Sequence, residues 1–136
     1  MEGSETLGAR PLVVGANHRS SSLALRDRLF VEDADIPAFL SRLRAKGIDN
    51  AVLLSTCDRV EVLASHSDPR NAAASIQACF ADLLGNADFT LETQCYTLVD
   101  DRAVEQIFAV SASLDSQIVG EPQVLGQVKA AHRIAR

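Results

Sequence analysis

Apolar and polar residues follow one another along the chain with two different periods, which separate predicted strands from predicted helices. Short apolar runs and two-residue alternation predict strands over residues 11–18, 50–57, 59–65 and 89–99. Apolar residues three and four positions apart predict helices over residues 20–31, 32–48, 68–85, 101–114 and 122–136. Within the third strand, Val60 and Val62 face one way while Arg59 and Glu61 face the other. This order of elements indicates an α+β fold, a ferredoxin-like βαββαβ-type sandwich with a C-terminal helical extension.

The second and third predicted helices carry boundary signals. Pro37 falls in the first turn of the second helix, and Gly47 follows its last turn. Asp68 is suited to cap the third helix, with Pro69 in its first position and Gly85 at its end. These residues make both helices firm predictions.

The domain organisation is predicted to be simple. Residues 1–10 are polar and form a flexible leader, and residues 11–136 form one domain. The last predicted helix still repeats its apolar face when the sequence stops at Arg136, with no glycine to end it. We therefore expect a fragment of a longer protein.

The composition is typical of a folded, soluble protein, since 47% of the 136 residues are hydrophobic and 23% are charged. The net charge of -5 argues against nucleic-acid binding by bulk electrostatics, although it allows a local basic contact to RNA. Residues 1–10 lack the apolar core of a signal peptide, and no apolar run reaches membrane-spanning length. We expect a cytoplasmic protein without a membrane partner.

The three cysteines, Cys57, Cys79 and Cys95, form neither a CxxC pair nor a metal-binding spacing. They predict a reducing compartment and no structural zinc site. Cys79 lies on an amphipathic helix and Cys95 in a predicted strand beside Tyr96, and both are best explained as packing residues. The histidines make no metal motif either: His18, His66 and His132.

Cys57 has different neighbours. It follows Thr56 where an apolar strand ends, and in extended backbone Arg59 would share its face and favour the thiolate. Asp58 opposes that effect, because a nearby carboxylate disfavours a second negative charge. From these residues alone, an inert cysteine is favoured over a nucleophile.

A second candidate site lies in residues 119–129. Pro122 at the start of a helix leaves backbone N–H groups free to receive an anion, and Gln123 and Gln127 share a helix face beside Glu121. A solvated helix start explains the same residues and is favoured when they are taken alone. The sequence contains neither GxGxxG nor GxxxxGK[ST], so we predict no dinucleotide or phosphate-loop site in this chain.

Three blocks of the sequence carry a family likeness: GANHRSSSLALRDRL, LLSTCDRVEVLA and AVEQIFAVSASLDSQIVGEPQVLGQVKAA. In this order they resemble the N-terminal catalytic domain of glutamyl-tRNA reductase, over nearly the whole chain after the leader. The resemblance implies that Cys57 attacks the ester of glutamyl-tRNA and forms a thioester, which NADPH reduces to glutamate-1-semialdehyde for tetrapyrrole biosynthesis.

The resemblance also implies a glutamate pocket, in which Arg59 pairs with the substrate carboxylate. Its residues would be Thr56, Cys57, Asp58, Arg59, Ser116, Glu121, Pro122, Gln123 and Gln127. The NADPH-binding domain and the dimerisation domain of the family have no counterpart in this sequence. The fragment alone should therefore not complete the reduction. The full-length protein is expected to be a homodimer that channels its product to the downstream aminomutase.

Four positions depart from the family pattern. Asp58 stands where asparagine is common, Gln106 where the family has a histidine implicated in activity, Ala109 where it has arginine, and Ser113 where it has glycine. Glutamine cannot titrate, so an acid or base role for Gln106 is in question. These departures leave an alternative open, namely a catalytically impaired homologue that binds glutamyl-tRNA or a partner and regulates flux.

Overall fold

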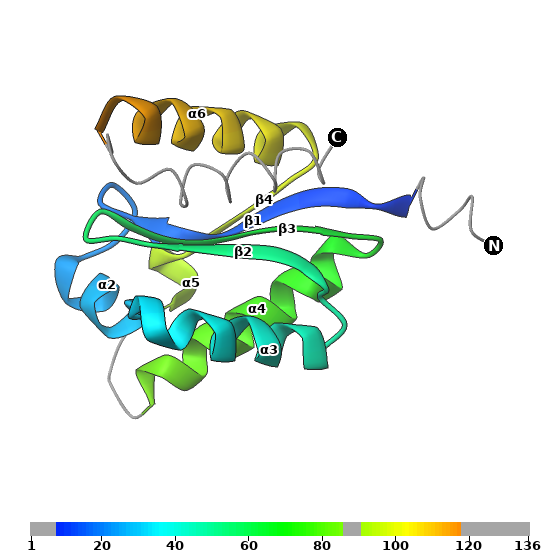
Figure 1. Cartoon of the computed structure of the whole chain (residues 1–136), viewed down its shortest axis with the longest axis horizontal. Coiled ribbons are helices and arrows are strands. Elements are labelled where there is room, and N and C mark those ends of the chain that lie inside the picture. Colours follow the sequence, from blue (N-terminus) through cyan, green and yellow to red (C-terminus); the bar gives the residue numbers. More distant parts are fainter. Residues whose placement is uncertain (1–7, 86–90, 118–136) are drawn as a thin grey trace.

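A four-stranded sheet forms the centre of the molecule, which was analysed as a computed structural model that describes residues 8–85 and 91–117. The strands lie in the order β2-β3-β1-β4, and each neighbouring pair is antiparallel (Figure 1). Their bounds are β1 Arg10–Asn17, β2 Asn50–Ser55, β3 Arg59–His66 and β4 Tyr96–Val99. The fold is therefore α+β, as the hydrophobic pattern predicts.

Helices cover both faces of this sheet. Figure 1 shows α2, α3, α4 and α5 on one side and α6 on the other. The bounds of the helices are α2 Leu23–Leu29, the 3₁₀ turn Asp33–Asp35, α3 Ile36–Ala45, α4 Pro69–Leu84, α5 Leu91–Gln94 and α6 Asp101–Gln117. Among the described residues, no helix combines the length and apolar character needed to cross a membrane.

Each sheet face has its own apolar cluster, because successive side chains of a strand point to opposite faces. Val14 and Val62 belong to the larger cluster, which packs against α2, α3 and α4. Val13 and Leu63 belong to the smaller cluster, which contains Ile107 of α6. Two-sided burial explains why β1 reads in the sequence as an unbroken apolar run.

The predicted helix boundaries are found in the structure. Ser22 caps α2 by accepting a hydrogen bond from the Leu25 N–H at 3.1 Å, and Asp68 caps α4 by accepting from Asn71 at 3.3 Å. Gly85 ends α4 with a φ of 58°, a value that favours glycine. Local chemistry thus sets where these helices start and stop.

Two predicted elements begin differently in the structure. The strand predicted over 89–99 is wrong in its first half, since the Cys95 N–H donates to the Leu91 carbonyl at 2.7 Å and closes a short helical turn. Cys95 therefore precedes β4 rather than lying in a strand. The helix predicted over 32–48 begins as a 3₁₀ turn, because Pro37 has no N–H to donate to Asp33, and Ile36 donates instead.

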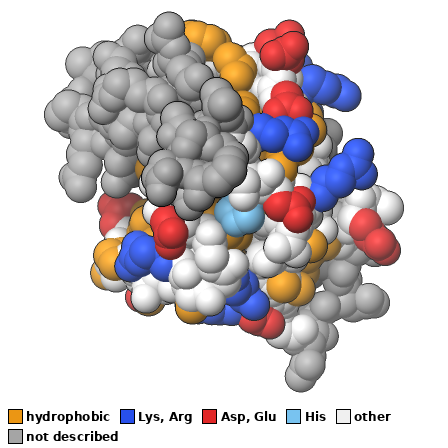
Figure 2. Space-filling model, turned by 90° about the vertical axis from the view of Figure 1, so that its right-hand side faces the viewer, with side chains coloured by type: hydrophobic (Ala, Val, Ile, Leu, Met, Phe, Trp, Pro, Cys, Tyr) orange, Lys and Arg blue, Asp and Glu red, His pale blue; other side chains and the backbone are white. Residues whose placement is uncertain are grey.

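The helix predicted over 122–136 lies outside the described residues. On the face of the molecule drawn in Figure 2, acidic and basic side chains of the described residues are interspersed rather than gathered by sign.

Candidate active site

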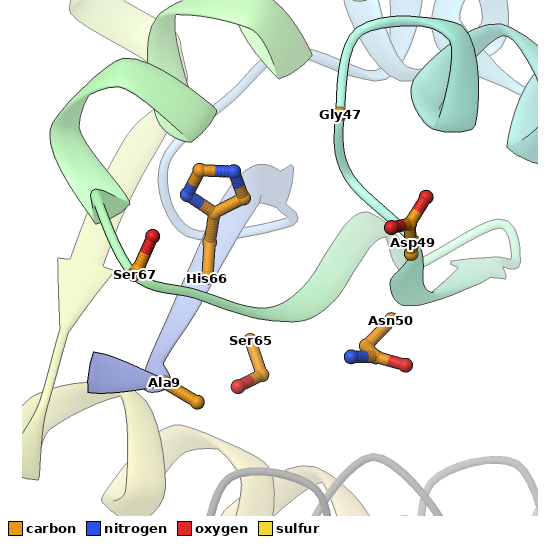
Figure 3. A pocket seen from close by; sticks show the side chains of 7 residues that line it. All are labelled: Ala9, Gly47, Asp49, Asn50, Ser65, His66 and Ser67. Carbon is orange, nitrogen blue, oxygen red and sulfur yellow. The ribbon is translucent and has the colours of Figure 1, made fainter. Parts of the chain in front are cut away.

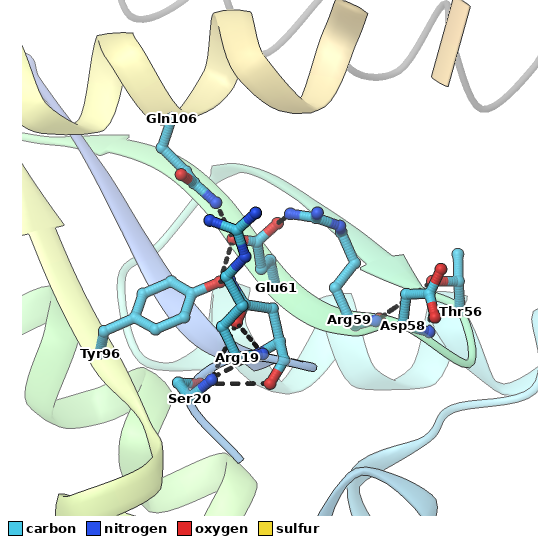
Figure 4. Close-up of polar contacts among 9 residues, drawn as sticks. Arg19, Ser20, Thr56, Asp58, Arg59, Glu61, Tyr96 and Gln106 are labelled. Carbon is cyan, nitrogen blue, oxygen red and sulfur yellow. Dashed lines mark hydrogen bonds and ion pairs between the residues drawn. The ribbon is translucent and has the colours of Figure 1, made fainter. Parts of the chain in front are cut away.

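Cys57 lies at the tip of the hairpin that joins β2 to β3, and its side chain is exposed. The Thr56 N–H donates to the Arg59 carbonyl at 2.8 Å and closes the turn. The Thr56 hydroxyl accepts hydrogen bonds from the N–H groups of Asp58 and Arg59, each at 3.2 Å (Figure 4). Thr56 therefore shapes a tight turn that presents the thiol to solvent.

This turn corrects one prediction. Strand β2 ends at Ser55, not at residue 57, so Cys57 and Arg59 do not share the face of an extended strand. The argument that placed the Arg59 guanidinium beside the sulfur on that ground is wrong. The polar group that the structure places near the thiol is the Asp58 carboxylate, whose Oδ1 atom is 3.9 Å from Cys57 Sγ.

Arg59 is held by a buried carboxylate. Its Nη1 atom lies 3.1 Å from Glu61 Oε1, and the side chains of Arg59 and Glu61 are 17% and 0% exposed. Both point to the same side of β3, as the alternation predicts, but Glu61 is buried where the pattern indicates only a polar face. A guanidinium has five donors in a fixed fork, and among the described residues Glu61 takes one of them, so Arg59 can present other donors to a ligand.

The second oxygen of Glu61 has two further donors. Gln106 of α6 donates from Nε2 to Oε2 at 2.7 Å, and the Tyr96 hydroxyl of β4 donates to the same oxygen (Figure 4). Burying an unpaired carboxylate costs on the order of several kcal/mol, and these hydrogen-bond partners offset that cost for Glu61. The site thus joins β3, β4 and α6 through one carboxylate.

Tyr96 is fixed as a donor. Burial, with the nearby Glu61 carboxylate as the next cause, holds the pKa of Tyr96 far above its usual range. The phenol therefore keeps its proton for Glu61, while its oxygen accepts a hydrogen bond from Asn17 Nδ2 at 3.2 Å. Asn17 at the end of β1 is in this way connected to the Arg59 site.

Gly15 makes room for Glu61. The two residues face each other in the pairing of β1 with β3. A Cβ atom on Gly15 would come within 2.3 Å of the Val60 carbonyl oxygen and 2.7 Å of Glu61 Cγ. Only glycine fits at this position, because real Cβ atoms do not approach neighbours so closely.

The other two cysteines are poor candidates for a nucleophile. Cys79 is fully buried in the larger core cluster. Burial raises the pKa of Cys95 to about 11, so this thiol is neutral near pH 7. Among the described cysteines, only Cys57 is exposed.

Not every predicted site residue can be placed. Thr56, Cys57, Asp58 and Arg59 form the turn, and Gln106 reaches it through Glu61. Ser116 belongs to α6, but its side chain falls outside the described part of the chain. The remaining predicted pocket residues also lie outside it: Glu121, Pro122, Gln123 and Gln127.

A separate hollow lies at the opposite end of the hairpin. Figure 3 shows the side chains that line it: Ala9, Gly47, Asp49, Asn50, Ser65, His66 and Ser67. It contains none of the predicted catalytic groups. No three His, Cys, Asp or Glu side chains in residues 8–85 and 91–117 gather as metal ligands.

Comparison with known proteins decides the family. A family model described as the N-terminal domain of glutamyl-tRNA(Glu) reductase matches residues 14–136. The chain belongs to this family. A glutamyl-tRNA reductase from Rhodospirillum rubrum is 44% identical over 125 residues, which cover 92% of this chain and 29% of the relative. A glutamyl-tRNA reductase from Salinispora arenicola is 42% identical over 91% of this chain and 28% of its own length.

A solved glutamyl-tRNA reductase from Methanopyrus kandleri has the same fold. Its TM-score is 0.54 and its identity 27%, over 92% of this chain and 28% of that one. The chain thus spans less than a third of the length of these glutamyl-tRNA reductases.

Several residues of this glutamyl-tRNA reductase domain escaped prediction. Glu61, Tyr96 and Asn17 lie far apart in the sequence, and only the sheet and α6 bring them together. One signal was available, because Glu61 ends the Ser-Thr-Cys-x-Arg-x-Glu run that carries the resemblance. A charged residue two positions after Arg59 on a strand is a natural ion-pair partner.

Proposed function

We propose that this chain is the catalytic domain of a glutamyl-tRNA reductase and that Cys57 is its nucleophile. The observation that carries the proposal is the Thr56 turn, which presents an exposed thiol two residues before Arg59, an arginine anchored by a buried carboxylate. The family membership supports the same assignment. The enzyme would be an NADPH-dependent oxidoreductase of tetrapyrrole biosynthesis.

The first step is an acyl transfer. The Cys57 thiolate attacks the carbonyl carbon of the ester that joins glutamate to the terminal ribose of its tRNA. The ribose oxygen leaves with a proton, and a thioester to Cys57 remains. A thioester accepts hydride more readily than an oxygen ester does, which is the chemical reason for using cysteine. NADPH, bound outside the described residues, would supply the hydride that converts the Cys57 thioester to glutamate-1-semialdehyde and frees the cysteine.

Arg59 is the group that recognises the substrate. The side-chain carboxylate of the glutamyl group is planar and accepts two parallel N–H bonds from a guanidinium. Arg59 Nη1 donates to Glu61, and this bond fixes the orientation of the guanidinium before the substrate binds. Thr56 and Asp58 complete the near side of the pocket, and Ser116, Glu121, Pro122, Gln123 and Gln127 are proposed for the far side.

Gln106 supports Glu61 rather than moving a proton. Its Nε2 atom already donates to Glu61 Oε2, and an amide does not titrate. The proton that the leaving ribose oxygen takes up must therefore come from water or from another group. With glutamine rather than histidine at position 106, the domain thus lacks a proton donor at this position.

The described residues do not fit NADPH. Their sheet is antiparallel throughout, whereas dinucleotide sites use parallel strands with a glycine-rich turn into a helix. NADPH supplies the hydride when bound, and we place its site outside these residues. We infer that the 136-residue chain forms the thioester but not the aldehyde. Dimerisation through a further domain, a cytoplasmic location and channelling to the downstream aminomutase belong to the same proposal.

We assign the fold to the ferredoxin-like type. The strand order β2-β3-β1-β4 and the antiparallel pairing of each neighbour support this assignment. Helix α4 follows β3 and α6 follows β4, so α6 is the start of the helical extension. The α6 extension has a functional consequence here, because it delivers Gln106 to Glu61.

One specific observation favours the alternative, a catalytically impaired homologue that binds glutamyl-tRNA or a partner as a regulator. The Asp58 carboxylate lies 3.9 Å from the thiol, where its negative charge repels the carboxylate of an acidic substrate. Gln106 adds to this case, since it cannot act as an acid or base.

The two readings separate in one experiment. The chain is mixed with tRNA that carries labelled glutamate, and binding and label transfer to protein are measured together. Label that becomes acid-stable on the protein supports the enzyme. Tight binding of the tRNA without any label transfer supports the regulator and rejects the thioester mechanism.

A further inference from the structure

A second arginine contacts the Cys57 turn. Arg26 lies in α2, and only 8% of it is exposed. Its Nε atom donates to the Cys57 carbonyl oxygen at 3.2 Å. We propose that Arg26 is a positioning residue that fixes the peptide following the nucleophile. Its role in acyl transfer rests on the function proposed above.

The guanidinium joins three separate segments of the chain. Besides Cys57, its Nη1 atom donates to the Ser21 carbonyl at 2.7 Å, to the Ser21 hydroxyl at 3.2 Å and to the Asn17 carbonyl at 3.3 Å. These acceptors lie at the end of β1, ahead of α2 and in the hairpin turn. Arg26 thereby ties the turn to the end of β1, one of the two central strands of the sheet.

The acceptors make a purely stabilising role a poor explanation. Within the described part of the chain, every acceptor of Arg26 is a carbonyl or hydroxyl oxygen, and none is a carboxylate. A buried cation without an opposite charge is unfavourable compared with a well-packed apolar side chain. Placing such a cation against the carbonyl of an exposed cysteine points to a role in the chemistry at that cysteine.

The peptide unit between Cys57 and Asp58 is hydrogen-bonded at both its oxygen and its N–H group. Arg26 holds the oxygen of the Cys57–Asp58 peptide, while the N–H of that peptide donates to Thr56 Oγ1 at 3.2 Å. A peptide plane with both polar groups bonded cannot rotate freely, and its orientation sets the backbone angle ψ of Cys57. The direction of the Cα–Cβ bond of Cys57 relative to this peptide is therefore fixed before an ester approaches, which limits the positions that the sulfur can take.

Asn17 extends this connection to the substrate side. Its carbonyl accepts from Arg26, and its side-chain amide donates to Tyr96, which bonds Glu61, the anchor of Arg59. Both the Cys57 turn and Arg59 are thus connected to Asn17 through hydrogen bonds. Loss of Arg26 frees the turn while leaving Arg59 in place.

The test compares Arg26→Gln with Arg28→Gln in the full chain. Arg28 is a matched control, since it lies in the same helix and donates to a backbone carbonyl, that of Leu84, at 2.9 Å. In single-turnover acylation by glutamyl-tRNA, Arg26→Gln should lower the maximal rate about 10- to 100-fold and change KM less than about twofold, as expected for a misdirected nucleophile. Arg26→Lys should recover part of the rate, and Arg28→Gln should match the unmodified chain.

A second readout does not depend on tRNA. The ¹⁵N order parameter of the Asp58 amide should fall in Arg26→Gln, while that of the Arg28→Gln variant stays at the value of the unmodified chain. If the unmodified chain forms no thioester, the proposed function fails, and this measurement still decides the positioning role. If Arg26→Gln does not fold, Ser21→Ala, which removes one acceptor of Arg26, should show a smaller loss of the same kind. An unchanged maximal rate and an unchanged order parameter in the folded variants would overturn the proposal, as would an equal loss in Arg28→Gln.

Discussion

Arg59 and Glu61 form an ion pair 3.1 Å long in which the carboxylate is completely buried and the guanidinium reaches the surface. The pair therefore has an inner partner, Glu61, and an outer partner, Arg59, that can present further donors to a ligand. Tyr96 and Gln106 share the other oxygen of Glu61, so the negative charge is supported by groups from three elements. This arrangement is the basis for reading Arg59 as a preorganised carboxylate receptor.

Replacing Glu61 by Gln should lower both stability and substrate recognition. Arg59 loses its charged partner, and the free energy of unfolding should fall by about 2–4 kcal/mol. KM for glutamyl-tRNA should rise, because the guanidinium is no longer oriented. Urea denaturation and acylation kinetics measure the two effects. Glu105→Gln is the control, since Glu105 is exposed on the same helix as Gln106, and it should change neither quantity.

Gly15→Ala should destabilise the protein strongly. The added methyl group meets backbone atoms of β3 at 2.3 and 2.7 Å, which side-chain motion cannot relieve. We expect the free energy of unfolding, measured by urea denaturation, to fall by about 3 kcal/mol or more. This value is at the upper end of the range for overpacked cores. Gly8→Ala is the matched control, because its methyl group would meet only Ser67 Cβ at 3.5 Å. Equal stability of the two variants would show that Gly15 is not needed to seat Glu61.

Both the success and the failure of sequence-based prediction are instructive here. The Asp68 cap of α4, its end at Gly85 and the first strand follow from residues close in sequence, and these predictions are confirmed. The Cys57 turn was missed because its geometry depends on the Thr56 hydroxyl, which competes with the strand ladder for backbone N–H groups. A pattern of apolar residues contains no information on that competition.

The burial of Glu61 was unpredictable for a different reason. Its partners Tyr96 and Gln106 are 35 and 45 residues away, and only the pairing of β1 with both β3 and β4 places them together. Strand alternation predicts the face on which Glu61 lies, but the cover on that face comes from α6. Long-range contacts of this kind require the fold first.

Gln106→His should raise the rate of thioester formation. A histidine at this position can still donate to Glu61 and can also exchange a proton near neutral pH, which glutamine cannot do. We expect a gain of roughly 10- to 100-fold and a new limb in the pH–rate profile. The control is Gln77→His, because Gln77 is half-buried and its side chain, like that of Gln106, donates a hydrogen bond to a strand residue, in this case Thr97 of β4. A rate equal to that of the unmodified chain would mean that Gln106 costs the domain nothing.

Stability should decline in alkali through Cys95. Its pKa is raised from 9.0 to about 11 in the folded state, chiefly by burial, so the folded protein keeps a proton that the unfolded chain releases above pH 9. The stabilising effect is complete below pH 9 and is lost as the pH rises to 11, with a size of up to about 2 kcal/mol. Urea midpoints between pH 8 and 11 measure it. Cys95→Ala should have a shallower decline than the unmodified chain, and parallel curves would contradict this account.

The central claim is that Cys57 carries the glutamyl group, and peptide mapping by mass spectrometry tests it most directly. The chain is incubated with glutamyl-tRNA, quenched in acid and digested, in parallel with Cys57→Ser and Cys95→Ser. We predict a hydroxylamine-sensitive glutamyl adduct on the peptide that contains Cys57, present in the unmodified chain and in Cys95→Ser and absent from Cys57→Ser. An adduct on another residue, or one that persists in Cys57→Ser, would contradict the account.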